Sequence, residues 1–441
     1  MPARPSRARR TPPARSRAPA RRLSPARSRG PARTTRLRVS ARLGNLPPYV
    51  FAELDRLKAE HKARGHDLID LGMGNPDLPP PAPVVDALRR ALSEPANHRY
   101  PVFQGLDEFR EAVAAWCSRR YGVALDPASE VAPLVGSKEG LVHLTMALVG
   151  PGDVVLAPQP AYPAHFRGPI LADAIPFAIP QRRAADLFPA AALSSGPRGD
   201  QLLPDLDAIP ARVLRKARLL ILSFPTNPTA YCAPVALFEK AVQLARRQRL
   251  VLVHDFAYAE IYFDGCRPPS LLALPGAKET AVEFHSFSKT FSMAGWRLGF
   301  ATGNAAIIGA MMKFKSNCDY GVFQAAQQAG VAALRLGDDH LGPMRDTYRR
   351  RRDLFVEGLN RLGWRLDPPS ATMYLWVPAP RGWTGTRFAG ALLEKAKVVV
   401  APGDAFGEGG RHFVRVALVD DEERLREALR RIESAGITPG A

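Results

Sequence analysis

The sequence predicts an α/β fold built on a mostly parallel sheet that is covered by helices. Over residues 76–330, short apolar runs typical of strands alternate with longer helical patterns, and this alternation favours parallel strands joined by helical crossovers. The hydrophobic fraction of 46% can supply a sizeable core for a chain of 441 residues, a length that suggests about two to three domains. Several polar residues stand at the ends of the strand-like runs, where open α/β sheets bind ligands.

The pattern divides the chain into four regions. These are an Arg- and Pro-rich tail (1–42), an arm with a first helix (43–75), a large domain (76–330) and a C-terminal region (331–441). The last region is predicted to contain an amphipathic helix around 344–362, strands at 373–377 and 413–419, and a helix over 421–434. We expect it to join the arm as a smaller α+β domain that closes over a substrate.

The N-terminal tail carries most of the net charge. Residues 1–42 hold fourteen arginines and no acidic residue, which leaves only +5 of the total of +19 for the rest of the chain. Rich in Pro, Ala and Ser, the tail cannot bury enough apolar surface to fold. We favour a disordered extension or a start codon assigned too far upstream. A targeting peptide and an arm that contacts nucleic acid or another polyanion are the alternatives.

Cysteine usage and hydropathy narrow the class of protein. Cys117, Cys232, Cys266 and Cys318 are scattered without metal-ligand spacing. We therefore expect no metal, and reduced thiols in a cytoplasmic protein. No apolar run approaches the roughly 18 residues that a membrane-spanning helix needs.

One lysine lies in a setting that suits carbonyl chemistry. Lys289 follows the apolar run 281–284 and lies among small hydroxyl residues, including Ser286 and Ser288, with Arg297 eight positions later. A partly desolvated lysine beside another cation has a lowered pKa and becomes an amine nucleophile. The two hydroxyls and the guanidinium are donors that a phosphate monoester requires. This combination indicates pyridoxal 5′-phosphate held on Lys289 as a Schiff base, whereas the alternative is a solvated surface lysine.

Two upstream segments supply what that cofactor lacks. Asp255 ends the apolar run 249–255 and could keep the pyridine nitrogen protonated, so that the ring accepts electrons. Tyr258 could donate a hydrogen bond to the 3′-oxygen of the ring. Asn227 follows the run 219–224 within a loop that two prolines restrain. Taken singly, Asp255 could instead be a helix cap and Asn227 a turn residue.

The order of these motifs resembles one family. Asn227-Pro228, Asp255-x-x-Tyr258, Ser286-x-Ser288-Lys289 and Arg297 follow one another as in the class I and II aminotransferases of fold type I, and the similarity covers roughly residues 43–436. The resemblance implies a seven-stranded sheet between helices and a smaller domain. It also implies that Lys289 is the Schiff-base lysine and general acid/base, that Asp255 is the pyridinium partner, and that Asn227 and Tyr258 bind the 3′-oxygen.

The resemblance assigns the remaining cofactor contacts. Gly136, Ser137 and Lys138 resemble the phosphate-binding turn at a helix N-terminus, although many such turns bind nothing. Tyr162 stands where the family stacks an aromatic ring on the pyridine, and an ordinary buried tyrosine is the alternative. Tyr100 resembles the tyrosine that reaches the phosphate of the neighbouring subunit. This last role implies a homodimer with shared active sites.

Substrate recognition requires a cation for the α-carboxylate of an amino acid. Arg415 is the single arginine within the apolar strand candidate 413–419. A bidentate guanidinium–carboxylate pair would orient the Cα–H bond for removal, and the resemblance places the substrate arginine here. A structural salt bridge is the alternative. Gly74 resembles the glycine that lets the backbone approach the substrate.

Within the family, the segments 42–51, 73–77, 136–140 and 319–321 are similar to the branch of alanine and LL-diaminopimelate aminotransferases. The bacterial glutamate–pyruvate enzymes resemble the chain most. Ala230, Cys318 and Val322 depart from the usual pattern near the substrate side, which puts the substrate's identity in doubt.

The predicted activity is transfer of an amino group between an L-amino acid and a 2-oxo acid by a ping-pong mechanism, with alanine and 2-oxoglutarate as the first choice. LL-diaminopimelate or another amino acid as the donor, or C–S lyase chemistry on the same scaffold, is the alternative. A transcription regulator with an aminotransferase-like domain is disfavoured, because residues 1–42 cannot form the folded DNA-binding domain that such proteins carry.

Overall fold

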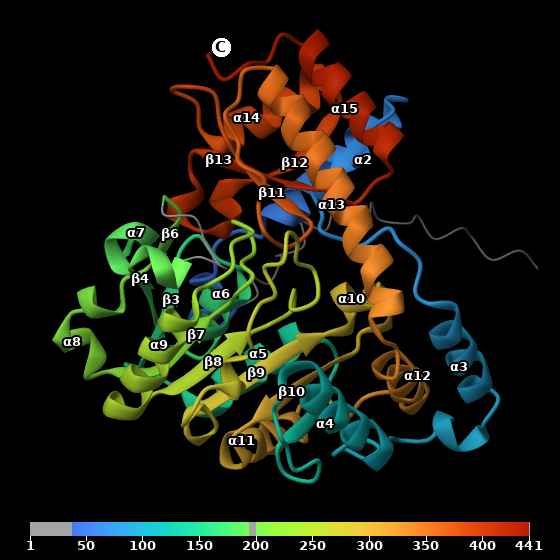
Figure 1. Ribbon diagram of the computed structural model, residues 1–441, viewed down its shortest axis with the longest axis vertical. Helices are drawn as coiled ribbons and strands as arrows, with labels where there is room; N and C mark the ends of the chain where they lie inside the picture. The colour runs from blue at the N-terminus through green and yellow to red at the C-terminus, as the bar shows by residue number, and fades with distance from the viewer. Residues whose placement is uncertain (1–37, 194–199, 441) are drawn as a thin grey trace, which may run out of the picture. The chain divides into compact units, whose positions relative to one another are not determined.

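The computed structural model describes residues 38–193 and 200–440 (Figure 1). The chain divides into two compact units, Met1–Ser40 and Ala41–Ala441. The predicted tail lies, up to residue 37, outside the described residues. Its last two positions belong to helix α1 (Ala41–Gly44) of the second unit, where Arg42 Nη1 donates to the Leu171 carbonyl at 3.3 Å. Among the described residues, no helix has the length and apolar character needed to span a bilayer.

A seven-stranded sheet forms the centre of the second unit (Figure 1). In spatial order its strands are β2 (Val131–Leu134), β10 (Gly299–Gly303), β9 (Ala281–Ser286), β8 (Val251–Asp255), β7 (Ala217–Leu222), β3 (Val154–Pro158) and β4 (Ile175–Ile179). Only β10 runs antiparallel to its neighbours, β2 and β9. The other neighbouring pairs are parallel, which confirms the predicted mostly parallel sheet.

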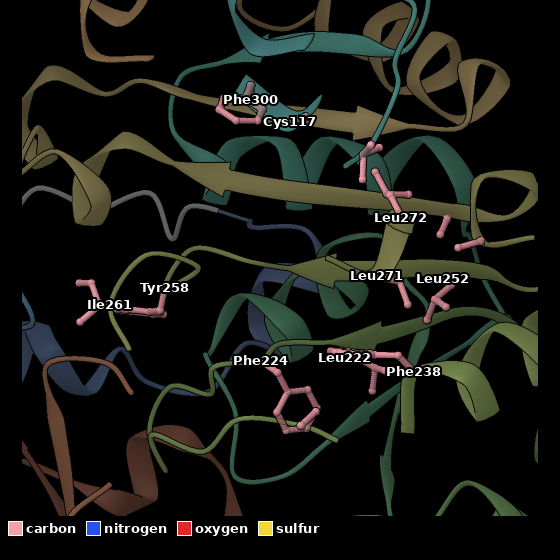
Figure 2. Close-up of a cluster of buried hydrophobic side chains, with 14 of the residues drawn as sticks. Cys117, Leu222, Phe224, Phe238, Leu252, Tyr258, Ile261, Leu271, Leu272 and Phe300 are labelled. Atoms are coloured by element: carbon pink, nitrogen blue, oxygen red, sulfur yellow. The ribbon is translucent and has the colours of Figure 1, made fainter. Parts of the chain in front are cut away.

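Both faces of this sheet are buried. Successive side chains of a strand point to opposite faces, so Leu220 and Leu222 enter one hydrophobic core while Leu219 and Ile221 enter another. Figure 2 shows part of the first core, around Leu222 and Phe238. The first core is covered by α3 (Ala82–Leu92), α4 (Asp107–Tyr121), α9 (Val235–Gln248) and α12 (Gln324–Leu334), and the second by α5 (Ser137–Leu148), α6 (Ala164–Leu171) and α11 (Ala305–Lys315).

A four-stranded sheet combines one strand from the first part of the described chain with three strands from its last part. Its spatial order is β1 (Ile69–Leu71), β12 (Val398–Pro402), β13 (Phe413–Ala417) and β11 (Tyr374–Pro378). Strand β1 pairs in parallel with β12, so the segment that follows α2 (Val50–Ala63) completes a sheet made otherwise of C-terminal strands. A separate hydrophobic core lies between this sheet and the helices α13 (Asp338–Arg361), α14 (Gly385–Ala391) and α15 (Glu422–Ser434).

The predicted C-terminal strands and terminal helix lie within one or two residues of the observed elements, whereas the helix predicted around 344–362 begins six residues earlier, at Asp338, and ends at Arg361. The strand predicted at 373–377 is shifted by one residue in β11, and that predicted at 413–419 ends at Ala417 in β13. Asp421 precedes α15 as its N-cap, because its side chain accepts a hydrogen bond from the Arg424 amide at 2.8 Å. The remaining short elements are β5 (Gln181–Arg183), β6 (Leu202–Pro204), α7 (Ala184–Leu187), α8 (Ala211–Leu214) and α10 (Phe287–Thr290).

Candidate active site

The carboxyl ends of β7, β8 and β9 open into a pocket that also receives side chains from the four-stranded sheet. It is lined by Tyr49, Met73, Gly74, Ser137, Tyr162, Ser223, Asn227, Asp255, Ala257, Tyr258, Lys289, Tyr374 and Arg415. Eight of these residues were predicted from the sequence. They come from segments more than 300 positions apart, and the strand order of the two sheets brings them together.

Lys289 reaches into the pocket from α10, the short helix directly after β9. Its Nζ donates to the Gly74 carbonyl at 2.5 Å. Burial lowers the pKa of Lys289, and the positive charges of Arg415 and Arg297 act in the same direction, while Tyr374 opposes them. The amine is therefore nearer to its neutral, nucleophilic form than an exposed lysine would be.

Asp255 lies at the end of β8 and is almost completely buried. One carboxylate oxygen, Oδ2, accepts a hydrogen bond from His165 Nε2 at 3.0 Å. The other, Oδ1, is buried without a partner within the part of the chain that the structure describes. A buried carboxylate oxygen needs a donor, so the site suits a ligand that presents an N–H group there. Tyr162, also in the pocket wall, packs edge-on against His165 with ring centroids 5.8 Å apart.

Asn227 and Arg415 form a second polar pair. The Arg415 guanidinium donates from Nη1 to Asn227 Oδ1 and from Nη2 to the Gly72 carbonyl, both at 2.9 Å. It lies over the ring of Tyr374, 4.2 Å from the centroid. Arg415 is buried, with 3% of its surface exposed. These contacts fix a positive charge at the pocket wall.

The predicted anion-binding turn lies at the N-terminus of α5. Gly136 precedes the helix with a φ of 79°, and a Cβ at this position would lie 2.6 Å from Arg297 Nη2, so Arg297 lies directly against the turn. Burial lowers the pKa of Lys138, as do the charges of Arg167 and Arg297. An anion at this point would relieve the repulsion among the cations and face the positive end of the helix dipole.

Ser286 and Ser288 have a local structural role in addition to the predicted one. Ser286 is the N-cap of α10, and its hydroxyl accepts a hydrogen bond from the Ser288 amide at 3.3 Å. Both residues are buried. This cap starts the helix that presents Lys289. The predicted role of the two hydroxyls in binding a phosphate stays a prediction.

Tyr100 lies outside the pocket. Its side chain is 88% exposed, and its ring packs edge-on against Tyr320 with centroids 5.6 Å apart. The sequence predicts that Tyr100 reaches the active site of a neighbouring subunit. Such a contact requires the side chain to be exposed on its own subunit.

The sequence interpretation missed five of the lining residues, and it also missed His165, which lies behind the pocket wall. The lining residues are Tyr49, Met73, Ser223, Ala257 and Tyr374. His165 follows Tyr162 by three positions, and this closeness in the sequence was the one local signal that could have identified it. Tyr374 lies in an apolar strand with no distinguishing neighbour. Tyr49 packs against Lys138 and Arg167, with distances of 5.6 and 5.2 Å from its ring centroid to the two cationic groups, a contact that depends on tertiary structure.

Glu139, His143 and Asp319 have a spacing compatible with a metal ion. The ammonium of Lys315 already lies 2.7 Å from Asp319 and 3.2 Å from Glu139. A buried lysine thus neutralises these carboxylates, and we assign them a structural role.

Comparisons with known proteins agree on one family. The family model for class I and II aminotransferases matches residues 66–432. An LL-diaminopimelate aminotransferase from Moorella thermoacetica is 45% identical over 396 residues, which cover 90% of this chain and 98% of that protein. Another from Desulforudis audaxviator is 46% identical over 391 residues, covering 89% and 96% of the two chains.

Solved structures share the fold. The substrate-bound BacF structure from Bacillus subtilis is 37% identical, with a TM-score of 0.85 and coverage of 92% of this chain and 99% of that one. A probable N-succinyldiaminopimelate aminotransferase from Thermus thermophilus is 40% identical, with a TM-score of 0.79 and coverage of 88% and 100%.

Proposed function

Because the chain belongs to the class I and II aminotransferases, we propose that it uses pyridoxal 5′-phosphate to move an amino group between an L-amino acid and a 2-oxo acid. The observation that carries this proposal is the meeting of Lys289, Asp255, Asn227 and Arg415 in one buried pocket. A nucleophilic amine, an unsatisfied carboxylate and a carboxylate-binding cation are the three groups that such a transfer requires.

The residues present fit the cofactor. Asp255 Oδ1 lacks a donor among the described residues and would accept the pyridine N–H, while His165 holds the other oxygen. The N-terminus of α5 with Arg297 and Ser137 would hold the phosphate. When bound, pyridoxal 5′-phosphate supplies the aldehyde that reacts with amino groups and the ring that accepts the electron pair left on Cα.

Lys289 is proposed to have two tasks. Its Nζ would hold the aldehyde carbon of the bound cofactor in the absence of an amino acid. It would also take the proton from Cα of a bound amino acid. Burial lowers the pKa of Lys289 and so brings that pKa closer to the operating pH. A general base is most effective when its pKa lies near the operating pH.

Arg415 is proposed to bind the α-carboxylate of the substrate. Its side chain is already held by Asn227 and the Gly72 carbonyl, so little conformational freedom is lost when the substrate binds. A fixed carboxylate directs the Cα–H bond toward Lys289. While Asn227 Oδ1 accepts from Arg415, the amide nitrogen of Asn227 would donate to the 3′-oxygen of the cofactor. The hydroxyl of Tyr258 would be a second donor to that oxygen.

For the substrate, we propose LL-diaminopimelate as the amino acid. Sequence reasoning placed alanine with 2-oxoglutarate first and LL-diaminopimelate second. The relatives at 45% and 46% identity are named LL-diaminopimelate aminotransferases and align over almost their whole length, which favours the second choice. This ranking rests on the similarity, and the experiment below tests it directly.

We also propose a cytoplasmic homodimer. Three of the four cysteines are buried, and all four are free thiols, as is usual in a reducing compartment. The large side chains Tyr100, Val102, Tyr320 and Phe323 are exposed, and such a group of apolar side chains suits contact with a second copy of the chain.

The test is a comparison of amino donors on the purified enzyme loaded with cofactor. Each of LL-diaminopimelate, L-alanine and L-glutamate is added without an acceptor, and the absorbance of the bound aldehyde is followed. We expect the second-order rate constant for loss of that absorbance to be at least about tenfold higher with LL-diaminopimelate than with alanine. Faster depletion by alanine would restore the first choice from the sequence.

Two further measurements complete the test. Release of pyruvate and ammonia from a thioether amino acid without a 2-oxo acid would show a C–S lyase instead. Arg415→Lys should raise the KM of every carboxylate substrate by about tenfold or more, since one ammonium cannot replace the bidentate fork. An unchanged KM would refute the proposed role of Arg415.

A further inference from the structure

A buried histidine lies directly behind the proposed cofactor site. His254 precedes Asp255 in β8, so its side chain points to the opposite face of the sheet, and it is completely buried. Its Nε2 lies 3.0 Å from the Phe224 carbonyl, and its Nδ1 lies 2.8 Å from Glu283 Oε1. The ring stacks on Phe256 with centroids 4.6 Å apart.

These contacts join three adjacent strands where each approaches the pocket. Glu283 is the registered partner of His254 across the β8–β9 pair. Phe224 lies two residues beyond the end of β7. Beyond these points the strands deliver Asn227, Asp255 and Lys289. The imidazole ring therefore bridges Glu283 in β9 and the Phe224 carbonyl beyond β7, close to the strand ends that precede these three residues.

Both ring nitrogens face groups that accept. A backbone carbonyl can only accept a hydrogen bond, and so can an ionised carboxylate. Although burial opposes ionisation, His254 and His285 lower the pKa of Glu283 to about 2, and Glu283 also accepts from Ser270 Oγ and the Leu271 amide, each at 2.6 Å. Each ring nitrogen of His254 therefore lies within hydrogen-bond distance of one of these acceptors.

The loop that carries Asn227 is bonded to strand β8 as well as within itself. Its turn is held internally by the Thr226 amide, which donates to the Tyr231 carbonyl at 2.9 Å, and by the Ala230 amide, which donates to the Thr226 carbonyl at 3.0 Å. These bonds lie within the turn and do not reach a neighbouring strand. The bond from His254 to the Phe224 carbonyl attaches the loop to β8 three residues before Asn227.

We infer that His254 is a positioning residue: it sets the place of the Asn227 loop, and through the Asn227–Arg415 contact it sets the geometry of substrate binding. This role rests on the proposed function, since Asn227 and Arg415 are assigned to the site there. Arg415 Nη1 and Asn227 Oδ1 are 2.9 Å apart, so a displacement of the loop by a fraction of an ångström weakens that bond.

The test is a double-mutant cycle on kcat/KM for the amino donor, with His254→Phe and Asn227→Ala made singly and together in the cofactor-loaded enzyme. We expect about a tenfold loss for His254→Phe and about a hundredfold loss for Asn227→Ala. The double variant should match Asn227→Ala within about twofold, because His254 acts through Asn227. If the double variant instead lost about a thousandfold in kcat/KM, the two single losses would be multiplied and the inference would be overturned.

His285→Phe is the matched control. His285 is also a buried histidine near Glu283, with Nε2 3.7 Å from Oε2, and it stacks on Phe300, but it makes no contact with the Phe224 loop among the hydrogen bonds of the described residues. We expect a lower melting temperature and a kcat/KM within about threefold of wild type. A loss equal to that of His254→Phe would show general destabilisation and overturn the inference.

If His254→Phe does not fold because Glu283 loses its contact with the imidazole, His254→Gln replaces it in the same cycle. Its amide nitrogen can donate to the Phe224 carbonyl or to Glu283, but not to both. Failure of the proposed function would look different. In that case Asn227→Ala alone would leave kcat/KM unchanged, or the wild-type enzyme would transfer no amino group.

Discussion

The hydroxyl oxygens of Tyr258 and Tyr374 lie 2.8 Å apart although 116 positions separate the two residues in the chain. Tyr258 belongs to the loop after β8 in the large sheet, and Tyr374 is the first residue of β11 in the small sheet. The contact therefore joins the two sheets inside the pocket. Although burial opposes its ionisation, Arg415, Lys289 and Tyr258 together hold the pKa of Tyr374 below its usual value.

Tyr374→Phe should weaken both the fold and the site. The buried Tyr258 hydroxyl loses its partner, which costs about 1–3 kcal/mol of unfolding free energy. Tyr374 also raises the pKa of Lys289 against the other influences, so its removal should lower that pKa further. The neutral amine would then persist to lower pH. We expect the pH dependence of cofactor binding to the apoenzyme to shift to lower pH.

Tyr348→Phe is the matched control for that change. Tyr348 is equally buried, but its hydroxyl has no hydrogen-bond partner within the described ranges. Removing an unsatisfied hydroxyl should leave the unfolding free energy within about 0.5 kcal/mol or raise it slightly. Equal destabilisation by both substitutions would refute the claimed bond between Tyr258 and Tyr374.

Lys289→Ala should abolish the reaction while the protein stays folded. No other amine among the described residues lines the pocket, so both the binding of the aldehyde and the transfer of the Cα proton are lost. We expect kcat to fall by about 10⁴-fold or more, together with loss of the absorbance that the lysine-bound cofactor gives. Normal turnover would contradict the assignment of the site.

Lys289→Met should stabilise the apoenzyme at pH 7. Burial lowers the folded-state pKa of Lys289 below 10.5, so the folded protein binds fewer protons than the unfolded chain between those two values. Burying the charged lysine therefore lowers the unfolding free energy. This loss is present in full below the folded-state pKa and disappears as the pH rises toward 10.5. We expect a gain of about 0.5–2 kcal/mol at pH 7 that shrinks at alkaline pH, measured by denaturant unfolding. A gain independent of pH would exclude this origin.

The sequence was sufficient to predict which residues meet in the pocket where each follows a recognisable strand pattern. Lys289, Asp255 and Asn227 each follow an apolar strand run, and the parallel order of β7, β8 and β9 brings the ends of such runs together. The family resemblance added Arg415 and the turn at Gly136. Arg415 lines the pocket, and Gly136 directly precedes Ser137 in its wall, while their roles stay predictions.

Residues that act through tertiary contacts could not be found in this way. Tyr374 is one apolar-flanked tyrosine among several, and its importance depends on the approach of β11 to the loop after β8. His254 is separated by 29 positions from Glu283 and by 30 from Phe224. The register of β8 against β9 decides the first pairing, and a sequence without aligned relatives does not reveal that register.

Gly74→Ala should displace Tyr374. A Cβ on Gly74 would overlap the tyrosine hydroxyl and lie 2.6 Å from Cζ, so the ring must move, and the Arg415 guanidinium that lies over it moves as well. Overpacking of this kind costs about 1–3 kcal/mol. We expect the KM for the amino donor to rise by about tenfold or more. Gly150→Ala, where a Cβ meets nothing within 4 Å, should keep the wild-type KM. Equal KM values for the two variants would rule out this mechanism.

Shared active sites can be tested by combining two defective subunits. Tyr100→Ala removes the tyrosine proposed to reach the neighbouring phosphate, and Lys289→Ala inactivates its own site. In a hybrid dimer, the subunit that keeps Lys289 receives Tyr100 from its partner, so one complete site forms. Hybrids isolated with two affinity tags should show about half of the wild-type activity.

If Tyr100 acts instead within its own subunit, the hybrid contains no complete site and its activity cannot exceed half that of the Tyr100→Ala homodimer. Because Tyr100 is 88% exposed, the substitution should not alter the melting temperature of an isolated subunit, and any loss of activity can be assigned to the contact between subunits.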